Sequence, residues 1–124
     1  MIRCALVVDD SVIARVYMLD ILQNIGIPTV IDAENGAECL EIVRNDPPDV
    51  IFLDIEMPGM NGVQVLKAIR QFNREVMVIM MTSIANPEVV RQCVANGTNH
   101  YILKDLPEEK ITQRLRQILN IGGT

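Results

Sequence analysis

The sequence has no tryptophan and only two tyrosines and two phenylalanines in 124 residues. No indole is therefore available to stack on a flavin. The sequence also lacks Gly-x-Gly-x-x-Gly, the turn that cradles a dinucleotide pyrophosphate. Lysines and arginines form no run, and the net charge is −5, which argues against nucleic-acid binding by this domain alone. Together these absences disfavour a flavin, dinucleotide or nucleic-acid module.

Long apolar runs and patterned cysteines are also missing. No run approaches the roughly 18 residues of a membrane span, and no charged leader with an apolar segment precedes the first predicted strand. The three cysteines, Cys4, Cys39 and Cys93, are odd in number and lie at wide spacings. We therefore expect buried thiols and a soluble cytoplasmic protein without membrane contact. The length fits one domain, residues 1–124.

What the sequence does have is a strict alternation of short apolar runs and helical patterns. The runs predict strands over residues 4–8, 28–32, 49–53, 76–81 and 99–103. Helices are predicted over 12–25, from 35 or 36 to 45, from 63 onwards, over 87–96 and over 107–119. This alternation predicts an α/β fold, a doubly wound parallel sheet with helices on both faces. Residues 120–124 are expected to be a frayed end.

Acidic residues follow two of the predicted strands. Asp9 and Asp10 come after the first strand, and Asp54 comes after the third. Because the carboxyl ends of parallel strands share one edge of the sheet, these side chains should lie together. Three carboxylates repel one another unless a cation lies among them, and hard oxygen ligands suit Mg2+. Taken alone, each acid is more often a solvated residue or a helix cap, as Asp10 and Ser11 would be.

An ordered set of segments carries a family resemblance. The set consists of Leu6-Val7-Val8-Asp9-Asp10-Ser11, of Asp54 with Met57-Pro58-Gly59-Met60-Asn61-Gly62, of Met81-Thr82-Ser83, and of Tyr101-Ile102-Leu103-Lys104. In this order and spacing the segments resemble the receiver domains of bacterial response regulators. Single-domain chemotaxis-type regulators, the CheY-like group, are nearest in length. The resemblance implies a flavodoxin-like, five-stranded sheet of order 2-1-3-4-5.

The resemblance also implies a role for each residue. Asp54 would accept a phosphoryl group from a histidine kinase of a two-component system, in a Mg2+-dependent reaction. The metal ligands would be Asp10, Asp54 and the backbone carbonyl of Glu56, with Asp9 bound directly or through water. Lys104 and Thr82 would contact the phosphoryl oxygens, helped by the backbone N–H groups of Ile55 and Ser83. Such a chain is a phosphoacceptor signalling domain, catalysing only its own phosphorylation and dephosphorylation.

Phosphorylation would be transmitted by a pair of switch residues. Thr82 would move toward the phosphoryl group, and Tyr101 would turn inward into the space left behind. This would reshape a surface made by helix 87–96, strand 99–103 and the last helix, where a downstream target protein would bind. The kinase, the target and the biological process are not identified by the sequence.

Two features depart from the family pattern. Family members usually place proline after the lysine, whereas here Asp105 follows Lys104 and the proline is Pro107. A cis bond before a non-proline residue costs roughly 3–4 kcal/mol, so we predict a trans Lys104–Asp105 bond and assign Asp105 as a candidate cap of the last helix. Glu56 and Ile84 would border the path of the hydrolytic water and alter its entry, in a direction that the sequence leaves open.

Alternative functions remain at this point. A haloacid-dehalogenase-like phosphatase also uses an aspartyl nucleophile with Mg2+, but it needs aspartate and threonine where Glu56 and Pro58 stand, and no cap domain is present. A flavodoxin-like flavin or nucleotide module would meet the repulsive acids after the first strand. A degenerate receiver would lack the acidic residues, Thr82 and Lys104.

The chain could also be a receiver excised from a longer regulator with an output domain. Its start at Met1 favours a complete protein, whereas Gly122-Gly123 could open a linker.

Overall fold

The structure, a computed structural model, describes residues 1–83 and 86–121. Strands and helices alternate in the order β1 (Cys4–Val8), α1 (Val12–Asn24), β2 (Thr29–Ala33), α2 (Gly36–Asn45), β3 (Val50–Asp54), α3 (Gly62–Phe72), β4 (Met77–Thr82), α4 (Pro87–Ala95), β5 (His100–Leu103) and α5 (Glu108–Leu119). The predicted alternation is confirmed, with boundaries shifted by a residue or two. The predictions made for Ile84 and for residues 122–124 lie outside the described residues.

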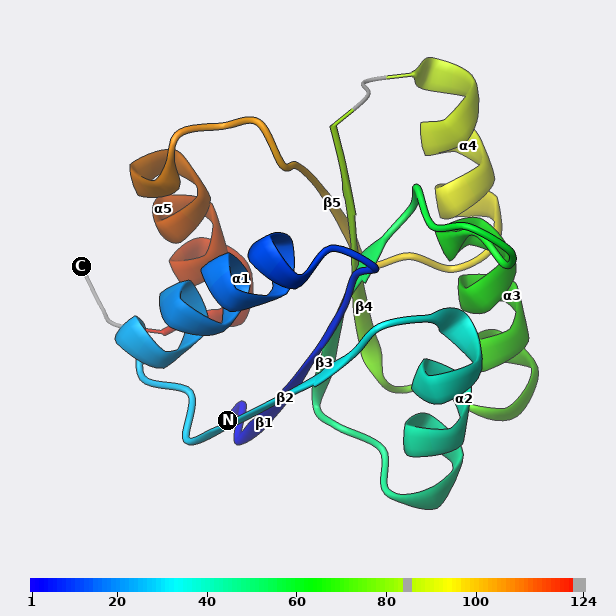
Figure 1. The fold of residues 1–124 in the computed structure, drawn as a ribbon, viewed down its shortest axis with the longest axis horizontal. Coiled ribbons are helices and arrows are strands. Elements are labelled where there is room, and N and C mark those ends of the chain that lie inside the picture. The colour runs from blue at the N-terminus through cyan, green and yellow to red at the C-terminus, as the bar shows by residue number, and fades with distance from the viewer. Residues whose placement is uncertain (84–85, 122–124) are drawn as a thin grey trace.

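The sheet is parallel, with strand order β2-β1-β3-β4-β5. Helices α1 and α5 cover one face, and α2, α3 and α4 cover the other (Figure 1). The strands are apolar along their whole length because side chains alternate between two buried faces. In β3, for example, Phe52 packs toward α1 and α5, whereas Leu53 packs toward α2 and α3. The expected doubly wound fold and its strand order are confirmed.

Short polar side chains start most of the helices. Ser11, Asn35, Asn61 and Asn86 each accept a hydrogen bond from a backbone N–H in the first turn of the helix that follows. The expectation that Asp105 caps α5 is wrong. Helix α5 begins at Glu108 behind Pro107, which has no side-chain acceptor, and no side chain caps it. Glu108 and Glu109 instead place negative charge near the positive end of the helix.

The expectation for the backbone between Lys104 and Asp105 agrees with the structure over the part of the chain that it describes. None of the described peptide bonds is cis, so the predicted trans Lys104–Asp105 bond is confirmed. Cys39 and Cys93 are buried, Cys4 is half-buried, and all three are free thiols. Within residues 1–83 and 86–121, no helix has the length and apolarity needed to cross a membrane.

Candidate functional site

The carboxyl edge of the sheet brings the predicted site residues together. Asp9 directly follows β1, Asp54 and Thr82 are the last residues of β3 and β4, and Lys104 directly follows β5. Backbone bonds between strands hold these positions in register. The Asp9 N–H donates to the Ala33 carbonyl over 3.2 Å, and the Lys104 N–H donates to the Thr82 carbonyl over 2.8 Å. The sheet itself therefore sets the spacing of the functional side chains.

Lys104 joins two of the carboxylates. Its ammonium lies 2.8 Å from Asp9 Oδ2 and 3.3 Å from Asp54 Oδ1. Both acids are buried, with Asp9 5% and Asp54 3% exposed, while the lysine side chain keeps partial access to solvent. Burial lowers the pKa of Lys104, but the hydrogen bond to Asp9 and the charge of Asp54 outweigh this, so its pKa is raised. The lysine therefore stays cationic beside Asp54.

The acidic residues form a cluster with the geometry of a cation site. One carboxylate oxygen each from Asp9, Asp10 and Asp54 lies within 4.8 Å of the others. Burial and then the negative charge of Asp9 raise the pKa of Asp54 to about 7, although Lys104 opposes both effects. A bound cation would relieve this repulsion. All the donors are hard oxygens, which fit Mg2+ better than a softer metal.

The segment after Asp54 differs from the sequence expectation. The Ile55 N–H, expected to meet the phosphoryl group, instead donates to the Met81 carbonyl over 3.0 Å and extends the sheet ladder. The next N–H, that of Glu56, points back and donates to Asp54 Oδ1 over 3.3 Å. Glu56 therefore supplies a backbone donor to the Asp54 carboxylate.

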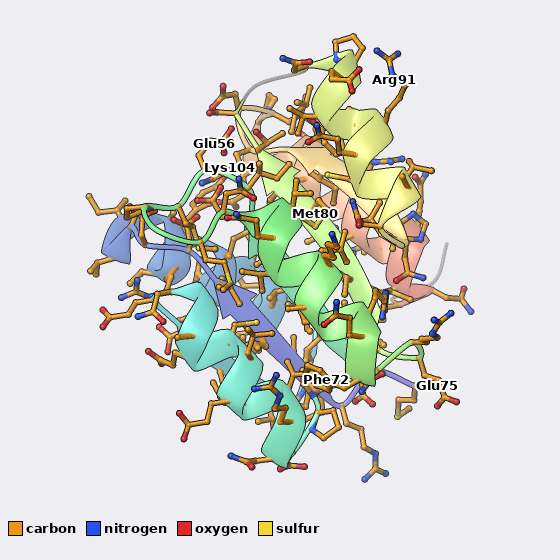
Figure 2. The ribbon with its side chains drawn as sticks, turned by 90° about the vertical axis from the view of Figure 1, so that its right-hand side faces the viewer. Glu56, Phe72, Glu75, Met80, Arg91 and Lys104 are labelled. Atoms are coloured by element: carbon orange, nitrogen blue, oxygen red, sulfur yellow. The ribbon has the colours of Figure 1, made fainter. Side chains whose placement is uncertain are left out.

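The side chain of Glu56 contacts Thr82, one of the two predicted switch residues. Its carboxylate accepts a hydrogen bond from the hydroxyl of Thr82, which is buried. Figure 2 places Glu56 and Lys104 at the same end of the molecule, above the carboxyl end of the sheet. The Thr82 hydroxyl is thus engaged by an anionic oxygen beside Asp54. Sequence reasoning had assigned only the backbone carbonyl and a water-path role to Glu56.

A glycine lets the loop after β3 turn back against Asp54. The Gly62 N–H donates to the Ile55 carbonyl over 2.9 Å, and a Cβ built on Gly62 would lie 2.3 Å from the Asp54 carbonyl oxygen. A side chain at this position would therefore push on the backbone of Asp54. The Asn61–Gln64 capping box then starts α3 directly after the loop.

Arg15 is a site residue that the sequence reasoning missed. Its guanidinium donates to the Asp9 backbone carbonyl over 2.7 Å and pairs with Asp32 Oδ2 over 3.1 Å. The side chain is only 12% exposed, so it braces the peptide that carries the acidic pair. The sequence does show a cation one turn into the helix that Ser11 caps. It does not show which oxygen this long side chain reaches.

Tyr101 is the second predicted switch residue. It belongs to β5, is half-buried and packs against the core beneath α2, α3 and α4. A cavity of about 290 Å³ is lined by Asp9, Asp54, Lys104 and Asp105, and its remaining wall is mostly apolar. The site thus has a solvent approach beside the first turn of α1.

Comparison with known proteins agrees with this geometry. The family model described as "Response regulator receiver domain" matches residues 5–116. The chain is 31% identical over 115 residues to chemotaxis protein CheY of Bacillus subtilis, covering 93% of this chain and 96% of that protein. It is 27% identical over 114 residues to sporulation initiation phosphotransferase F of the same organism, covering 92% and 91% of the two chains.

Solved structures of receiver proteins also resemble this chain. The chemotaxis response regulator CheY4 of Vibrio cholerae superposes with a TM-score of 0.86 at 28% identity, covering 95% of this chain and 99% of that one. These matches favour a receiver over the haloacid-dehalogenase-like alternative. The family is a signalling family rather than one of conventional enzymes. The chain belongs to the response-regulator receiver family, the phosphoryl-accepting proteins of two-component signal transduction.

Proposed function

We propose that residues 1–124 form one receiver domain in which Asp54 is the phosphoryl acceptor. The observation that carries the proposal is the double contact of Lys104, at 2.8 Å from Asp9 and 3.3 Å from Asp54, beside three clustered carboxylates. An acid buried next to a fixed ammonium and a cation site is the arrangement that phosphoryl transfer needs.

The proposed reaction begins with ionised Asp54. A carboxylate oxygen attacks phosphorus, the bond from phosphorus to the donor breaks, and the donor leaves with that electron pair. The product is an acyl phosphate on Asp54. Asp9, Asp10, Asp54 and the Glu56 carbonyl would hold a Mg2+ ion, which would supply positive charge to offset the carboxylates and the incoming phosphoryl oxygens. Lys104, freed from its contact with Asp54, pairs with a phosphoryl oxygen.

Thr82 completes the site from the neighbouring strand. Its hydroxyl donates to Glu56 before phosphorylation. A phosphoryl group on Asp54 offers a stronger, more highly charged acceptor at the same place, so the hydroxyl exchanges one partner for the other. Exchange frees the Glu56 carboxylate and pulls the end of β4, which is bonded to β5 through the Lys104 N–H.

The same strand pair carries the signal to Tyr101. Met80 pairs with Tyr101 in the sheet, two residues before Thr82. Inward rotation of the half-buried Tyr101 would change the surface formed by α4, β5 and α5. We assign this surface to a downstream target protein and assign the phosphoryl donor to a histidine kinase, on the strength of the receiver family.

Acetyl phosphate tests the proposed acceptor directly. With Mg2+ present, intact mass spectrometry should show one added phosphoryl group, and tandem mass spectrometry after borohydride trapping should place it on Asp54. Chelation of the metal and the Asp54→Asn substitution should each abolish the product. A phosphoryl group that persists in the Asp54→Asn protein would contradict the assignment.

A further inference from the structure

A second surface with its own chemistry lies at the amino-terminal edge of the sheet. Here the end of α3 and the turn after α4 enclose an open cleft of about 460 Å³. Lys67, Arg70 and Arg74 line one side, and Asn96, Gly97 and Asn99 line the other. Figure 2 places Phe72 and Glu75, at this end of α3, far from Glu56 and Lys104. The cleft is therefore separate from the phosphoryl-accepting site.

Arg70 reaches across the cleft and is held by residues of the opposite side. Its guanidinium donates to the Gly97 carbonyl over 3.0 Å, to the Asn99 side-chain oxygen over 2.9 Å and to the Asn73 carbonyl over 3.2 Å. The arginine crosses Gly97 so closely that a Cβ there would lie 3.2 Å from Arg70 Nε. All of these acceptors are neutral, so the arginine is held in place without an ion-pair partner among residues 1–83 and 86–121.

The other two cations are equally uncompensated. The ion pairs found over residues 1–83 and 86–121 involve Arg15, Arg91 and Lys104, and none of the three cleft cations takes part. The described lining of the cleft contains no carboxylate. In a chain with 16 acidic and only 11 basic residues, three bases gathered without an acid make a local positive field.

We propose that this cleft binds an acidic, carboxylate-bearing segment of a partner protein. Lys67 and Arg74 are exposed and can pair with separate carboxylates, while Gln71 and Asn96 can hydrogen-bond the peptide backbone. A polynucleotide fits less well, because its continuous phosphate charge needs a long basic track. Glu75 also directly follows Arg74 in the chain, and the net charge of −5 would repel a long polyanion.

The position of the cleft gives the contact a distinct property. Because it lies at the opposite edge of the sheet from Asp54, the partner segment and a phosphoryl donor can bind together. The contact should therefore hold the receiver near an acidic partner whether or not Asp54 is phosphorylated. It also does not depend on the assignment of Asp54 as the acceptor.

The test uses the full chain and a short fluorescein-labelled, glutamate-rich peptide, with its glutamine counterpart as the neutral probe. Anisotropy at physiological salt should show binding of the acidic peptide alone, and amide NMR shifts should map to the end of α3 and residues 95–99. The double variant Lys67→Glu, Arg74→Glu should weaken binding about tenfold or more, because both free cations are reversed. Asp54→Asn should leave affinity unchanged.

A matched double reversal elsewhere, Arg3→Glu with Lys110→Glu, changes the net charge equally and should cost less than about twofold. Thermal unfolding checks that all variants remain folded. The proposal is overturned if the acidic peptide does not bind, if the matched control loses as much affinity as the cleft variant, or if the shifts lie on another surface. Tighter binding of a single-stranded oligonucleotide than of the peptide would also overturn it, in favour of a nucleic-acid ligand.

Discussion

At the scale of single residues, Asp54 combines a buried carboxyl with charged neighbours of both signs. Its pKa is raised to about 7 from an ordinary 3.8, chiefly by burial and then by Asp9. The native state therefore holds this proton more tightly than the unfolded chain does. The stability that this proton contributes is complete below the unfolded value and is lost as the pH rises through about 7.

We accordingly predict that the metal-free protein becomes less stable as the pH rises from about 4 to about 7. Added Mg2+ should reduce this loss, because a cation among Asp9, Asp10 and Asp54 stabilises the ionised form. Thermal unfolding measured across this range, with chelator or with Mg2+, gives both curves. The Asp54→Asn protein should lose most of the pH dependence in this window, and an unchanged slope would contradict the prediction.

Glu56 gives a second residue-scale prediction. Its carboxylate lies beside Asp54 and accepts from Thr82, so an anionic phosphoryl donor meets an additional negative charge. Glu56→Gln keeps a hydrogen-bond acceptor but removes the charge, and should raise the rate of phosphorylation by acetyl phosphate roughly fivefold, for about 1 kcal/mol of relieved repulsion. Glu88→Gln, on α4, serves as the matched control. A slower Glu56→Gln protein would show that the carboxylate assists the reaction.

Some of these residues were predictable from the sequence, and others were not. Asp9, Asp10 and Asp54 follow from apolar runs that end in an acid, because parallel strands share a carboxyl edge. The side chains of Arg15 and Glu56 could not be placed in this way. Each is long and flexible, and its partner is chosen across elements by the fold rather than by local periodicity.

At the scale of elements, helix starts were largely readable because a cap and its N–H partners are neighbours in sequence. Asn86 with Pro87, for example, begins α4 as predicted. Asp105 failed as a cap because the helix starts further along, behind Pro107. Likewise, the Ile55 N–H was misassigned because β3 and β4 pair one residue beyond the apolar run. Such one-residue shifts depend on sheet register, which pattern alone does not fix.

The loop between β3 and α3 carries the element-scale prediction. Gly62→Ala would place a Cβ against the Asp54 carbonyl oxygen, where the structure leaves only 2.3 Å. The loop or the end of β3 must move, so we expect about 2 kcal/mol of destabilisation and a slower reaction at Asp54. Urea unfolding and phosphorylation by acetyl phosphate measure the two effects. Gly26→Ala controls for adding a methyl group to a glycine, since a Cβ there would meet nothing within 4 Å although its positive φ adds some strain.

At the scale of the whole molecule, the alternation of elements predicted the layers but not the strand order. Right-handed crossovers allow more than one order, and the order 2-1-3-4-5 came from the family resemblance. The separate cationic cleft was likewise invisible in the sequence. Arg70 and Gly97 meet there only because α3 and the turn after α4 pack side by side.

Long-range switching gives the last prediction. In the wild-type protein, beryllofluoride, a mimic of the phosphoryl group, should shift amide NMR signals at Asp54 and also across α4, β5 and α5. Thr82→Ala should retain the shifts near Asp54 but lose those of the distant surface, because the exchanging hydroxyl is gone. Thr82→Ser, which keeps the hydroxyl, should restore them. Distant shifts of full size in Thr82→Ala would refute a relay through Thr82.

The bond between Lys104 and Asp9 joins residues separated by 95 positions in the chain. Nearly the whole polypeptide must therefore be synthesised, and the fifth strand must join the sheet, before the ammonium of Lys104 can contact the carboxylate of Asp9. A chain still emerging from the ribosome, or one truncated before its fifth strand, holds acids without their lysine. The proposed acceptor site is therefore complete only in a chain that includes the fifth strand and the lysine that follows it.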